Sequence, residues 1–372
     1  KCKMPVFISK IINDRTLWIT SFLLVLMLIF GSVEIQDIDF QTIGALLSLM
    51  ILIGLFEKEG LLKYIAVIII KKCQTTRQVQ LTVFLLVFFG AMLLTNDVAI
   101  LTFIPIFIVI AQKINIKPVL PIILLTIFAN LGSSVTPFGN PQNIFLANYY
   151  HLGAGTFFKM ALPLGALSLT FLLLSGYLFK STPLENLTLT VPDIRVKQTI
   201  LLLIGSVIVL AGLLHLLPIF VSLITSIILT IIINYKNFVT VDYGIIILFV
   251  ELFLIVGGLS RVPMIVSLFK KLTTTELGAF ASGVGLSQVI SNVPAAVLLS
   301  AFTGHMYAVY LGVSIGGLGT IIASLANLLA WRQYQQQTDH QSLAFPLKLM
   351  LVNLIFLVIF VLIGVGLLMI SH

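Results

Sequence analysis

The sequence predicts an all-α polytopic membrane protein made of two inverted-topology repeats, and three observations lead to this fold class. Of the 372 residues, 59% are hydrophobic and 9% are charged, which is too apolar for a water-soluble globular domain. Apolar runs recur along the chain and leave no polar block long enough for a soluble domain. The two halves of the chain also carry a similar series of interruptions in these runs. Any chemistry must therefore take place inside a bundle embedded in the bilayer.

Charge and cysteine content exclude several classes of protein. The formal net charge of +8 comes from 21 Lys and Arg against 13 Asp and Glu, and in a membrane protein this excess reports topology and anionic lipid. No basic patch with interleaved aromatic residues is present, so we expect no nucleic-acid partner. Cys2 and Cys73 are too few for a disulfide framework or a Cys-rich metal site, and we expect no cofactor.

Seven apolar runs are long enough, or nearly so, to cross about 30 Å of hydrocarbon as helices. The first of them lacks the small-residue cleavage site of a secretory signal, so we expect a membrane helix there. The seven runs are 17–33, 43–56, 157–179, 199–217, 219–233, 243–258 and 347–370.

Four further elements are interrupted by polar residues. Two have short arms that suit re-entrant hairpins, with Asn96 at one tip and Asn292 at the other. The other two are long runs broken midway, and unwound backbone at membrane depth is tolerated only where it lines a cavity or is buried in protein. We therefore predict nine spans and two hairpins. The interrupted elements are the hairpins 80–111 and 277–303 and the broken helices 118–150 and 306–331.

An internal repeat supports this division. Residues 44–72 and 244–271 both run Gly, apolar helix, short polar break, apolar helix, Lys-Lys, and a hairpin with Asn at its tip follows each. Asn96 and Asn292 are 196 residues apart, Gly132 and Gly319 are 187 apart, and Asn143 and Asn327 are 184 apart. One unpaired span between the halves inverts the second half. The predicted organisation is a first repeat 1–180, a linker and connecting helix 181–217, and a second repeat 218–372.

The distribution of basic residues predicts the orientation. With the N-terminus in the cytoplasm, 17 of the 21 Lys and Arg fall in loops on the cytoplasmic side. Nine spans then place the C-terminus outside the cell membrane, whether inner or plasma membrane. Segments 57–73 and 260–272 are amphipathic and too short to span, so we expect them to lie in the interfaces as arms that support the hairpins.

The polar residues at the interruptions are the candidate site. Asn96 and Asn292 offer a carbonyl acceptor and amide donors, which suits them to bridge a cation and an anion, and the alternative is that each caps a hairpin arm. Helices that begin after Thr95, Pro141 and Ser291 would point partial positive charge at an anion. Released carbonyls would suit sodium. The predicted anion-binding residues are Thr95, Asn96, Ser133, Thr136, Asn140, Asn143, Ser291, Asn292, Thr320 and Asn327.

Glycines and hydroxyls complete the predicted ion sites. Pro137 and Pro141 keep the first break unwound, and the alternative is a Pro-kinked packing helix. The second break lacks these prolines, and the Gly312/Gly316 spacing in it is better explained by close helix packing. The candidate sodium-site residues are Asn96, Asp97, Gly132, Ser134, Gly139, Asn292 and Gly319.

Asp97 and Glu251 are the two acidic residues expected at membrane depth. Without a basic partner nearby in sequence, each must be protonated or bound to a cation for part of a cycle, so both are candidates for proton coupling. The alternatives are a structural cap for Asp97 and a neutral carboxyl hydrogen-bonded to backbone for Glu251.

Three motifs in order resemble the ion transporter superfamily, and more narrowly the arsenite-permease-like and citrate-transporter-like anion permeases: 94–99 (LTNDVA), 132–143 (GSSVTPFGNPQN) and 291–296 (SNVPAA). The resemblance covers nearly the whole chain. It implies a scaffold and a transport domain, often dimeric, that move substrate by an elevator-type alternating-access cycle. In the related divalent anion/sodium symporters, Ser-Asn-Thr tips and broken-helix loops hold sodium and a substrate carboxylate, which would carry over to Thr95, Asn96, Gly132, Ser133, Thr136, Ser291 and Asn292.

The chain departs from the symporter pattern, because Asp97 and Val293 stand where the tips have Thr. An added carboxylate repels a di- or tricarboxylate, and Val donates no hydrogen bond, which argues against Krebs-cycle acids. We therefore predict a secondary transporter of a small inorganic or organic anion, coupled to sodium or protons. The alternatives are a sodium/proton antiporter that uses Asp97 and an arsenite-type oxyanion efflux permease. A channel would need a continuous polar pore lining, and no catalytic arrangement supports an enzyme.

Overall fold

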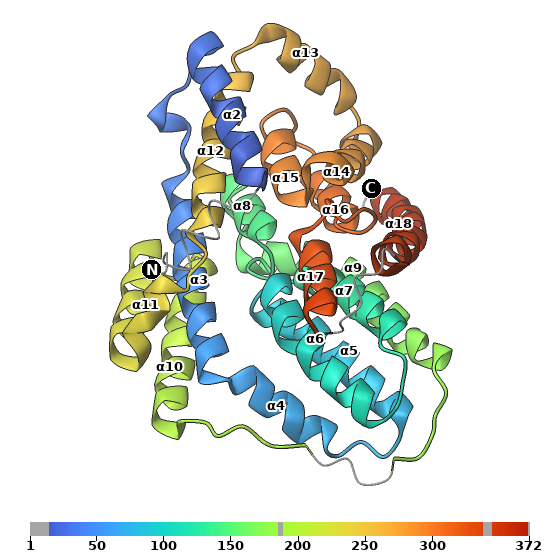
Figure 1. Ribbon diagram of the computed structural model, residues 1–372. Helices are drawn as coiled ribbons and strands as arrows, with labels where there is room; N and C mark the ends of the chain where they lie inside the picture. The colour runs from blue at the N-terminus through green and yellow to red at the C-terminus, as the bar shows by residue number, and fades with distance from the viewer. Residues whose placement is uncertain (1–14, 185–188, 338–343, 371–372) are drawn as a thin grey trace, which may run out of the picture.

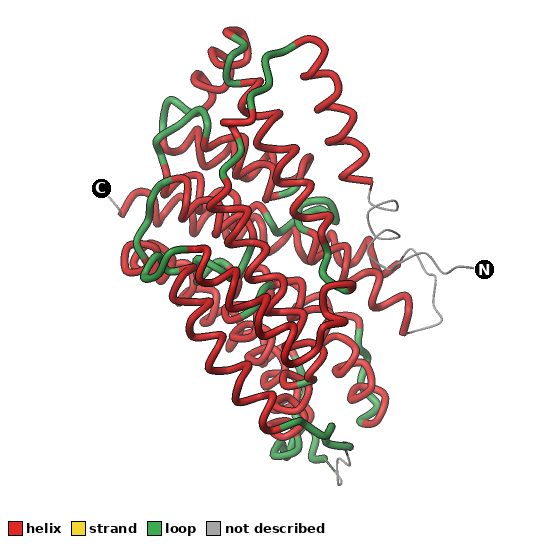
Figure 2. The backbone as a smooth tube through the Cα atoms, turned by 90° about the vertical axis from the view of Figure 1, so that its left-hand side faces the viewer, coloured by secondary structure: helices red, strands yellow, loops and turns green. Residues whose placement is uncertain are grey.

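The computed structural model describes residues 15–184, 189–337 and 344–370, and within these ranges the regular structure is helical (Figures 1 and 2). Cys2 and most of the basic N-terminal segment lie outside the described residues. The only strand-like feature in the described ranges is one isolated bridge between Thr75 and Pro183, where the linker that precedes the connecting helix crosses the start of the first hairpin.

The seven predicted spans are helices. Because the chain has few helix-breaking residues inside these runs, each helix covers most of its apolar run or extends beyond it. Their bounds are α2 (Arg15–Phe30), α3 (Phe40–Glu59), α9 (Ala154–Ser175), α10 (Val196–Leu213), α11 (Ile219–Asn234), α12 (Tyr243–Leu259) and α18 (Ala344–Ile370).

The four interrupted elements are helix pairs. The hairpins are α5 (Thr76–Leu93) with α6 (Asn96–Lys113) and α14 (Glu276–Ile290) with α15 (Asn292–Ser300). The broken helices are α7 (Val119–Ser133) with α8 (Pro141–Tyr149) and α16 (Met306–Gly316) with α17 (Leu325–Gln337). The breaks therefore fall where the polar interruptions predict them.

The arms of the first hairpin are longer than predicted. A capping box between Thr75 and Gln78 starts α5 four residues before the expected position 80. The arms α5 and α6 have 18 residues each. By length and composition both arms could cross a membrane. Seven helices of the described residues pass this test, or eight if α12 and the following helix count as one bent pair. The count of nine spans and two hairpins stays a prediction.

Two short helices connect the two sides of the molecule. These are α4 (Leu61–Ile70) and α13 (Pro263–Leu272), and Figure 1 shows them at opposite ends of the molecule. Gly60, with φ of 66°, turns the chain from α3 into α4, and α13 is bent by 100° from α12. Segments 57–73 and 260–272 thus do contain short helices, although residues 57–59 still belong to α3.

Helices of the first half pack against helices of the second half, an arrangement that we call crosswise packing. The second arm of each hairpin packs against the second part of the opposite broken helix, α6 against α17 and α15 against α8 (Figure 1). On the other side of the molecule, α2 packs against α12, and α3 against α10 and α11. The two hairpins and the two broken helices therefore form one central group.

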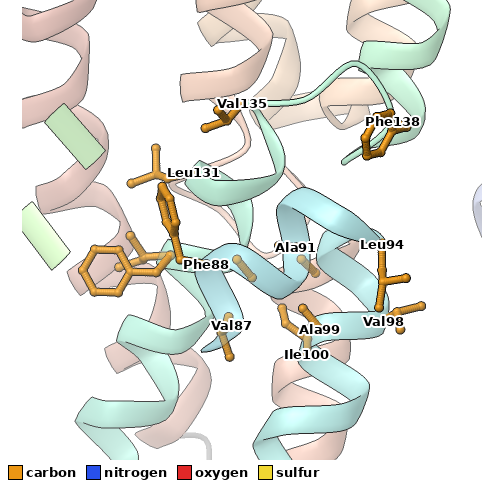
Figure 3. Packing of buried hydrophobic residues seen from close by; sticks show 14 of the residues in the cluster. Val87, Phe88, Ala91, Leu94, Val98, Ala99, Ile100, Leu131, Val135 and Phe138 are labelled. Carbon is orange, nitrogen blue, oxygen red and sulfur yellow. The ribbon is translucent and has the colours of Figure 1, made fainter. Parts of the chain in front are cut away.

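Close backbone contacts hold this group together. Apolar side chains such as Phe88 and Leu131 surround the first tip and break (Figure 3). A Cβ on Gly132 would lie 2.9 Å from the Cα of Phe88, so α7 and α5 touch through backbone there. In the second half a Cβ on Gly312 would lie 2.6 Å from the carbonyl of Phe280, which confirms a packing role for Gly312.

Candidate ion and anion site

The first hairpin tip is a capped helix start. Thr95 is extended, and its Oγ1 accepts the Val98 N–H at 3.4 Å, so α6 begins at Asn96. The Asn96 N–H donates to the Gly139 carbonyl at 3.2 Å, which ties the tip to the first break. The Asn96 Oδ1 accepts the Asp97 N–H at 2.8 Å. The residue that caps α6 is therefore Thr95 and not Asn96, and the Asn96 Nδ2 donates to another element.

One buried amide clamps the first break. Asn143 Nδ2 donates to the carbonyls of Thr136, Ser133 and Ser134 at 2.9, 3.0 and 3.3 Å. The hydroxyl of Thr136 donates to the Met92 carbonyl in α5 at 2.6 Å. Carbonyls that the helix releases are thus satisfied, whereas the buried Asn143 Oδ1 has no hydrogen-bond partner.

The second break repeats these hydrogen bonds. Asn327 Nδ2 donates to the carbonyls of Thr320 and Gly317 at 2.9 and 3.1 Å, as Asn143 does 184 residues earlier. The Thr320 hydroxyl donates to the Gln288 carbonyl at 3.1 Å, and the Asn292 N–H donates to the Ala323 carbonyl at 2.9 Å. These bonds match those of Thr136 and Asn96 in the first half.

This register corrects one sequence-based pairing. The separation of 184 residues between the clamping amides holds for the whole break, so Gly316 and not Gly319 corresponds to Gly132. The two glycines were paired by residue type, whereas the repeated feature is the amide clamp. Gly319 has φ of 103° and lies at the start of the second break.

The second tip is strained. Ser291 has φ of 74° and ψ of 156°, a conformation that residues other than glycine rarely adopt. Its hydroxyl makes only long hydrogen bonds, at 3.4 Å to Asn292 Oδ1 and to the Ala323 carbonyl. Gln288 closes the break beside it, because its Nε2 donates to Gly316 and Leu318 carbonyls at 2.8 and 3.0 Å.

Asn130 joins the two halves. Its Oδ1 accepts from Asn96 Nδ2 at 3.0 Å and from the Ser324 hydroxyl at 2.8 Å. Its Nδ2 donates to Asn327 Oδ1 at 3.1 Å. The first tip, the end of α7 and the second break therefore share one buried network. Asn292 lies close by, since a Cβ on Gly317 would be 2.9 Å from its Nδ2.

Several predicted residues lie in this group without joining the network. The hydroxyls of Ser133 and Ser134 donate to the Asn130 and Leu131 carbonyls of α7 at 2.8 and 2.7 Å. They keep only acceptor capacity toward a ligand. Asn140 is buried at the N-cap of α8, where its side chain makes no capping hydrogen bond.

The two acidic residues have different surroundings. Asp97 lies in the first turn of α6, and its Oδ1 is buried with no hydrogen-bond partner. Glu251 accepts hydrogen bonds from the hydroxyls of Thr20 and Ser21 on α2, the latter at 2.5 Å. Its partners are thus hydroxyls of a neighbouring helix and not backbone, and they lie outside the tips and breaks. A coupling role for Glu251 stays a prediction.

A cation here would need mixed oxygen ligands. Within the described ranges, no three His, Cys, Asp or Glu side chains come together to hold a metal ion. Amide, hydroxyl and carbonyl oxygens with one carboxylate suit sodium better than a transition metal.

Sequence reasoning missed Asn130 and Gln288. Both are polar residues inside otherwise apolar helical runs, and their cost in a membrane is the signal that could have found them. The tips and breaks drew attention because they interrupt the pattern, whereas these two side chains leave the helices intact.

Comparison with known proteins adds independent findings. Residues 6–311 match the family described as citrate transporter. An uncharacterized transporter of Methanocaldococcus jannaschii is 35% identical over 322 residues, 83% of this chain and 86% of that protein. The inner membrane protein YbiR of Escherichia coli is 29% identical over 317 residues, 79% of this chain and 80% of that protein. The crystal structure of the Alcanivorax borkumensis YdaH transporter has a similar fold, with a TM-score of 0.57 at 14% identity over 95% of this chain and 97% of that one.

Proposed function

Since the chain belongs to the citrate transporter family and is a multi-pass membrane permease rather than an enzyme, we propose that it moves a small anion by ion-coupled alternating access. The coupling ion is sodium or a proton. The anion and the ion bind between the two hairpin tips and the two breaks.

The observation that carries this proposal is the meeting of four helix starts. α6 and α15 begin at the two tips, and α8 and α17 begin directly after the two breaks. α6 packs against α17 and α15 against α8, and the Asn130 Oδ1 accepts hydrogen bonds both from Asn96 at the start of α6 and from Ser324 just before α17. Helix N-termini carry partial positive charge and unpaired N–H groups, so a pair of them provides a site for an anion at membrane depth.

Hydrogen bonding distinguishes the two half-sites. Asp97 Oδ1 and Asn143 Oδ1 are buried acceptors without partners, and the Asn96 amide donor is used by Asn130. The first half therefore offers oxygens to a cation. In the second half, Asn292 Nδ2 donates to none of the described residues, so we place the anion beside Asn292. The candidate ligands of the first half are Thr95, Asn96, Asp97, Gly132, Ser134, Gly139 and Asn143, and those of the second are Ser291, Asn292, Gly319 and Thr320.

Asp97 also limits the substrate. A charged carboxylate near the site repels a polyvalent anion, and a bound sodium ion or proton removes this repulsion. Cation binding therefore precedes anion binding in our scheme, which gives the differential affinity that coupling requires. Citrate, suggested by the family, and a small oxyanion such as arsenite are the two substrate classes to compare.

The arrangement of the helices suggests how the site moves. We assign α2, α3 and α10 to α12 to a scaffold, and the hairpins, broken helices, α9 and α18 to a transport domain. The arms α4 and α13 connect the two groups at opposite ends (Figure 1). The repeated hydrogen bonds of the two breaks support an inverted repeat. We propose the elevator cycle and a homodimer from family resemblance, and an N-terminus inside with a C-terminus outside from the distribution of Lys and Arg.

Flux measurements test this function. Uptake of labelled citrate or arsenite into proteoliposomes is measured under an inward sodium or proton gradient. Asn96→Ala and Asn292→Ala are the site variants. Both variants are expected to lose flux while keeping the elution volume of the folded protein. The control is Asn353→Ala, since Asn353 is buried on α18 and bonds only the Leu349 carbonyl of its own helix. Normal flux in both site variants would refute the site.

A sodium/proton antiporter is the second candidate, because the orphaned Asp97 carboxylate alone could carry either cation in turn. Sodium efflux that drives proton uptake when the only anion in either compartment is one that the membrane and the protein do not pass would favour it. Asp97→Asn then abolishes exchange entirely, whereas in an anion symporter the same variant keeps anion counterflow and loses its dependence on the gradient.

A further inference from the structure

We propose that Asn130 couples the first hairpin tip to the second broken helix, so that a cation bound at the tip orders the anion side of the site. The ligands in this inference rest on the proposed function. The linkage itself is a property of the fold and can be measured without them.

The hydrogen bonds of the network have one possible direction. The carbonyls of Gly317 and Thr320 only accept, so Asn327 must turn its Nδ2 toward them and its Oδ1 toward Asn130. Asn130 must then present Nδ2 to Asn327, which leaves its Oδ1 for the Asn96 amide and the Ser324 hydroxyl. Reversal of any one amide would place two donors or two acceptors face to face.

Because the network is buried, reversing one of its amides would raise the free energy of the folded state. Asn96, Asn130 and Asn327 are 2%, 3% and 1% exposed, so water is not at hand to replace a lost partner. The orientation of the Asn96 side chain at the first tip is therefore tied to the shape of the second break. A buried network whose members are all satisfied behaves as a single element with few alternative arrangements.

The network connects the two ligand positions. Its fixed direction points the Asn96 Oδ1 at the Asp97 N–H, at 2.8 Å, beside the unpartnered carboxylate oxygen. At the other end, Asn327 holds the Gly317 carbonyl, and the Asn292 amide lies next to Gly317. A cation that binds Asn96 and Asp97 thus stabilises the backbone beside the anion position.

A purely structural role would look different. Asn353, the buried asparagine of α18, bonds a carbonyl one turn earlier in its own helix at 2.9 Å. The side chain of Asn130 makes no such bond to α7, and its three partners lie on α6, on α17 and at Ser324 just before α17. Asn130 is therefore a positioning residue between elements and not a local helix anchor.

A mutant cycle tests the linkage without any ligand. The side chains of Asn96 and Asn327 share no hydrogen bond, and the hydrogen-bonded path between them runs through Asn130. Melting temperatures of Asn96→Ala, Asn327→Ala and the double variant are compared in the wild-type and the Asn130→Asp background. In its ionised form Asp keeps the acceptor for Asn96 and Ser324 and cannot donate to Asn327, so all melting temperatures are compared at an alkaline pH where the added carboxyl is ionised.

We expect non-additive shifts in the wild-type background and additive shifts with Asn130→Asp. Additive shifts in the wild-type background, or equal non-additivity in both, overturn the proposal. The pair Asn96→Ala with Asn353→Ala is the control, for which additivity is expected in both backgrounds.

The same variant tests coupling between ligands. Stabilisation by sodium chloride is titrated with and without citrate, and citrate is expected to raise the apparent sodium affinity of the wild type by about fivefold or more. Asn130→Asp should still respond to sodium and lose this enhancement, and an enhancement that persists in Asn130→Asp contradicts the proposal. A wild type that responds to neither probe refutes sodium coupling and citrate as the substrate in the proposed function, while the mutant cycle still decides the linkage.

Discussion

The first tip and break are buried and unstrained, whereas the second tip and break are partly exposed and strained, although the same hydrogen bonds hold both. Residues 132–140 are all buried, with prolines at 137 and 141. In the second break Ile322 is 62% exposed, and Ser291 at the neighbouring tip has φ of 74°. The repeated clamp fixes the geometry of both halves, and its surroundings decide how easily each half can change. We interpret the first half as the rigid cation side and the second as the side that adapts to the anion.

The largest expected difference in stability between the halves concerns Gly132 and Gly316, the glycines at the ends of α7 and α16. A Cβ on Gly132 would meet the backbone of Phe88, whereas a Cβ on Gly316 would lie 2.7 Å from the Cβ of Ser287. Gly132→Ala is therefore expected to cost about 3 kcal/mol or more, with loss of the folded protein from detergent extracts. Gly316→Ala should also destabilise, but Ser287→Gly should partly restore its melting temperature. Equal rescue of Gly132→Ala by a side-chain deletion in α5 would refute the backbone contact.

The tips are expected to respond to glycine with opposite sign. Ser291→Gly removes a strained conformation and only two long hydrogen bonds, so we expect a gain of about 1 kcal/mol in the free energy of unfolding. Thr95 is extended and caps α6, so Thr95→Gly removes a cap without relieving strain and lowers stability. Melting temperatures of the two variants measure this contrast. If Ser291→Gly destabilises as much as Thr95→Gly, the second tip is not strained.

The smallest effect is expected where the arms begin. Arg261, before α13, donates to both carboxylate oxygens of Asp37 at 2.6 and 2.9 Å, and Arg195 donates to Glu59 at the end of α3. The hydrogen bond from Arg261 holds the pKa of Asp37 below its ordinary value. A carboxyl with a lowered pKa stabilises the folded state above its ordinary pKa, and this stabilisation is lost as the pH falls through the lowered value.

Asp37→Asn should therefore lower the melting temperature slightly at neutral pH and have no effect in acid. The pair is partly exposed, so the change is expected to be small. If Asp37→Asn lowers the melting temperature more than Thr95→Gly does, α13 depends on this ion pair more than its exposure suggests.

Site residues that interrupt an apolar helical run could be predicted from the sequence. Site residues that lie within an unbroken helix could not. Clusters of Asn, Gly, Ser, Thr and Pro in apolar runs predicted the positions of both tips and both breaks, because several such residues together favour the end of a helix. Asn130 and Gln288 lie inside regular helices, and the Asn130 partner Asn327 is 197 residues away. Asn130 meets Asn327 only because helices of the first half pack against helices of the second half. Sequence rules that consider neighbouring residues cannot predict such a contact. The start of α5 was missed for a different reason, since a capping box extends a helix through polar residues.

The melting temperature in sodium chloride against potassium chloride at equal ionic strength tests the central claim most directly, which is that the first tip binds the coupling cation. A ligand that binds only the native state stabilises it by about 2.7 kcal/mol at a hundredfold excess over its Kd. If the first tip binds sodium, the wild type should have a higher melting temperature in sodium chloride than in potassium chloride. Asn96→Ala should have equal melting temperatures in both salts. A sodium effect that persists unchanged in Asn96→Ala, or no sodium effect in the wild type, would contradict it.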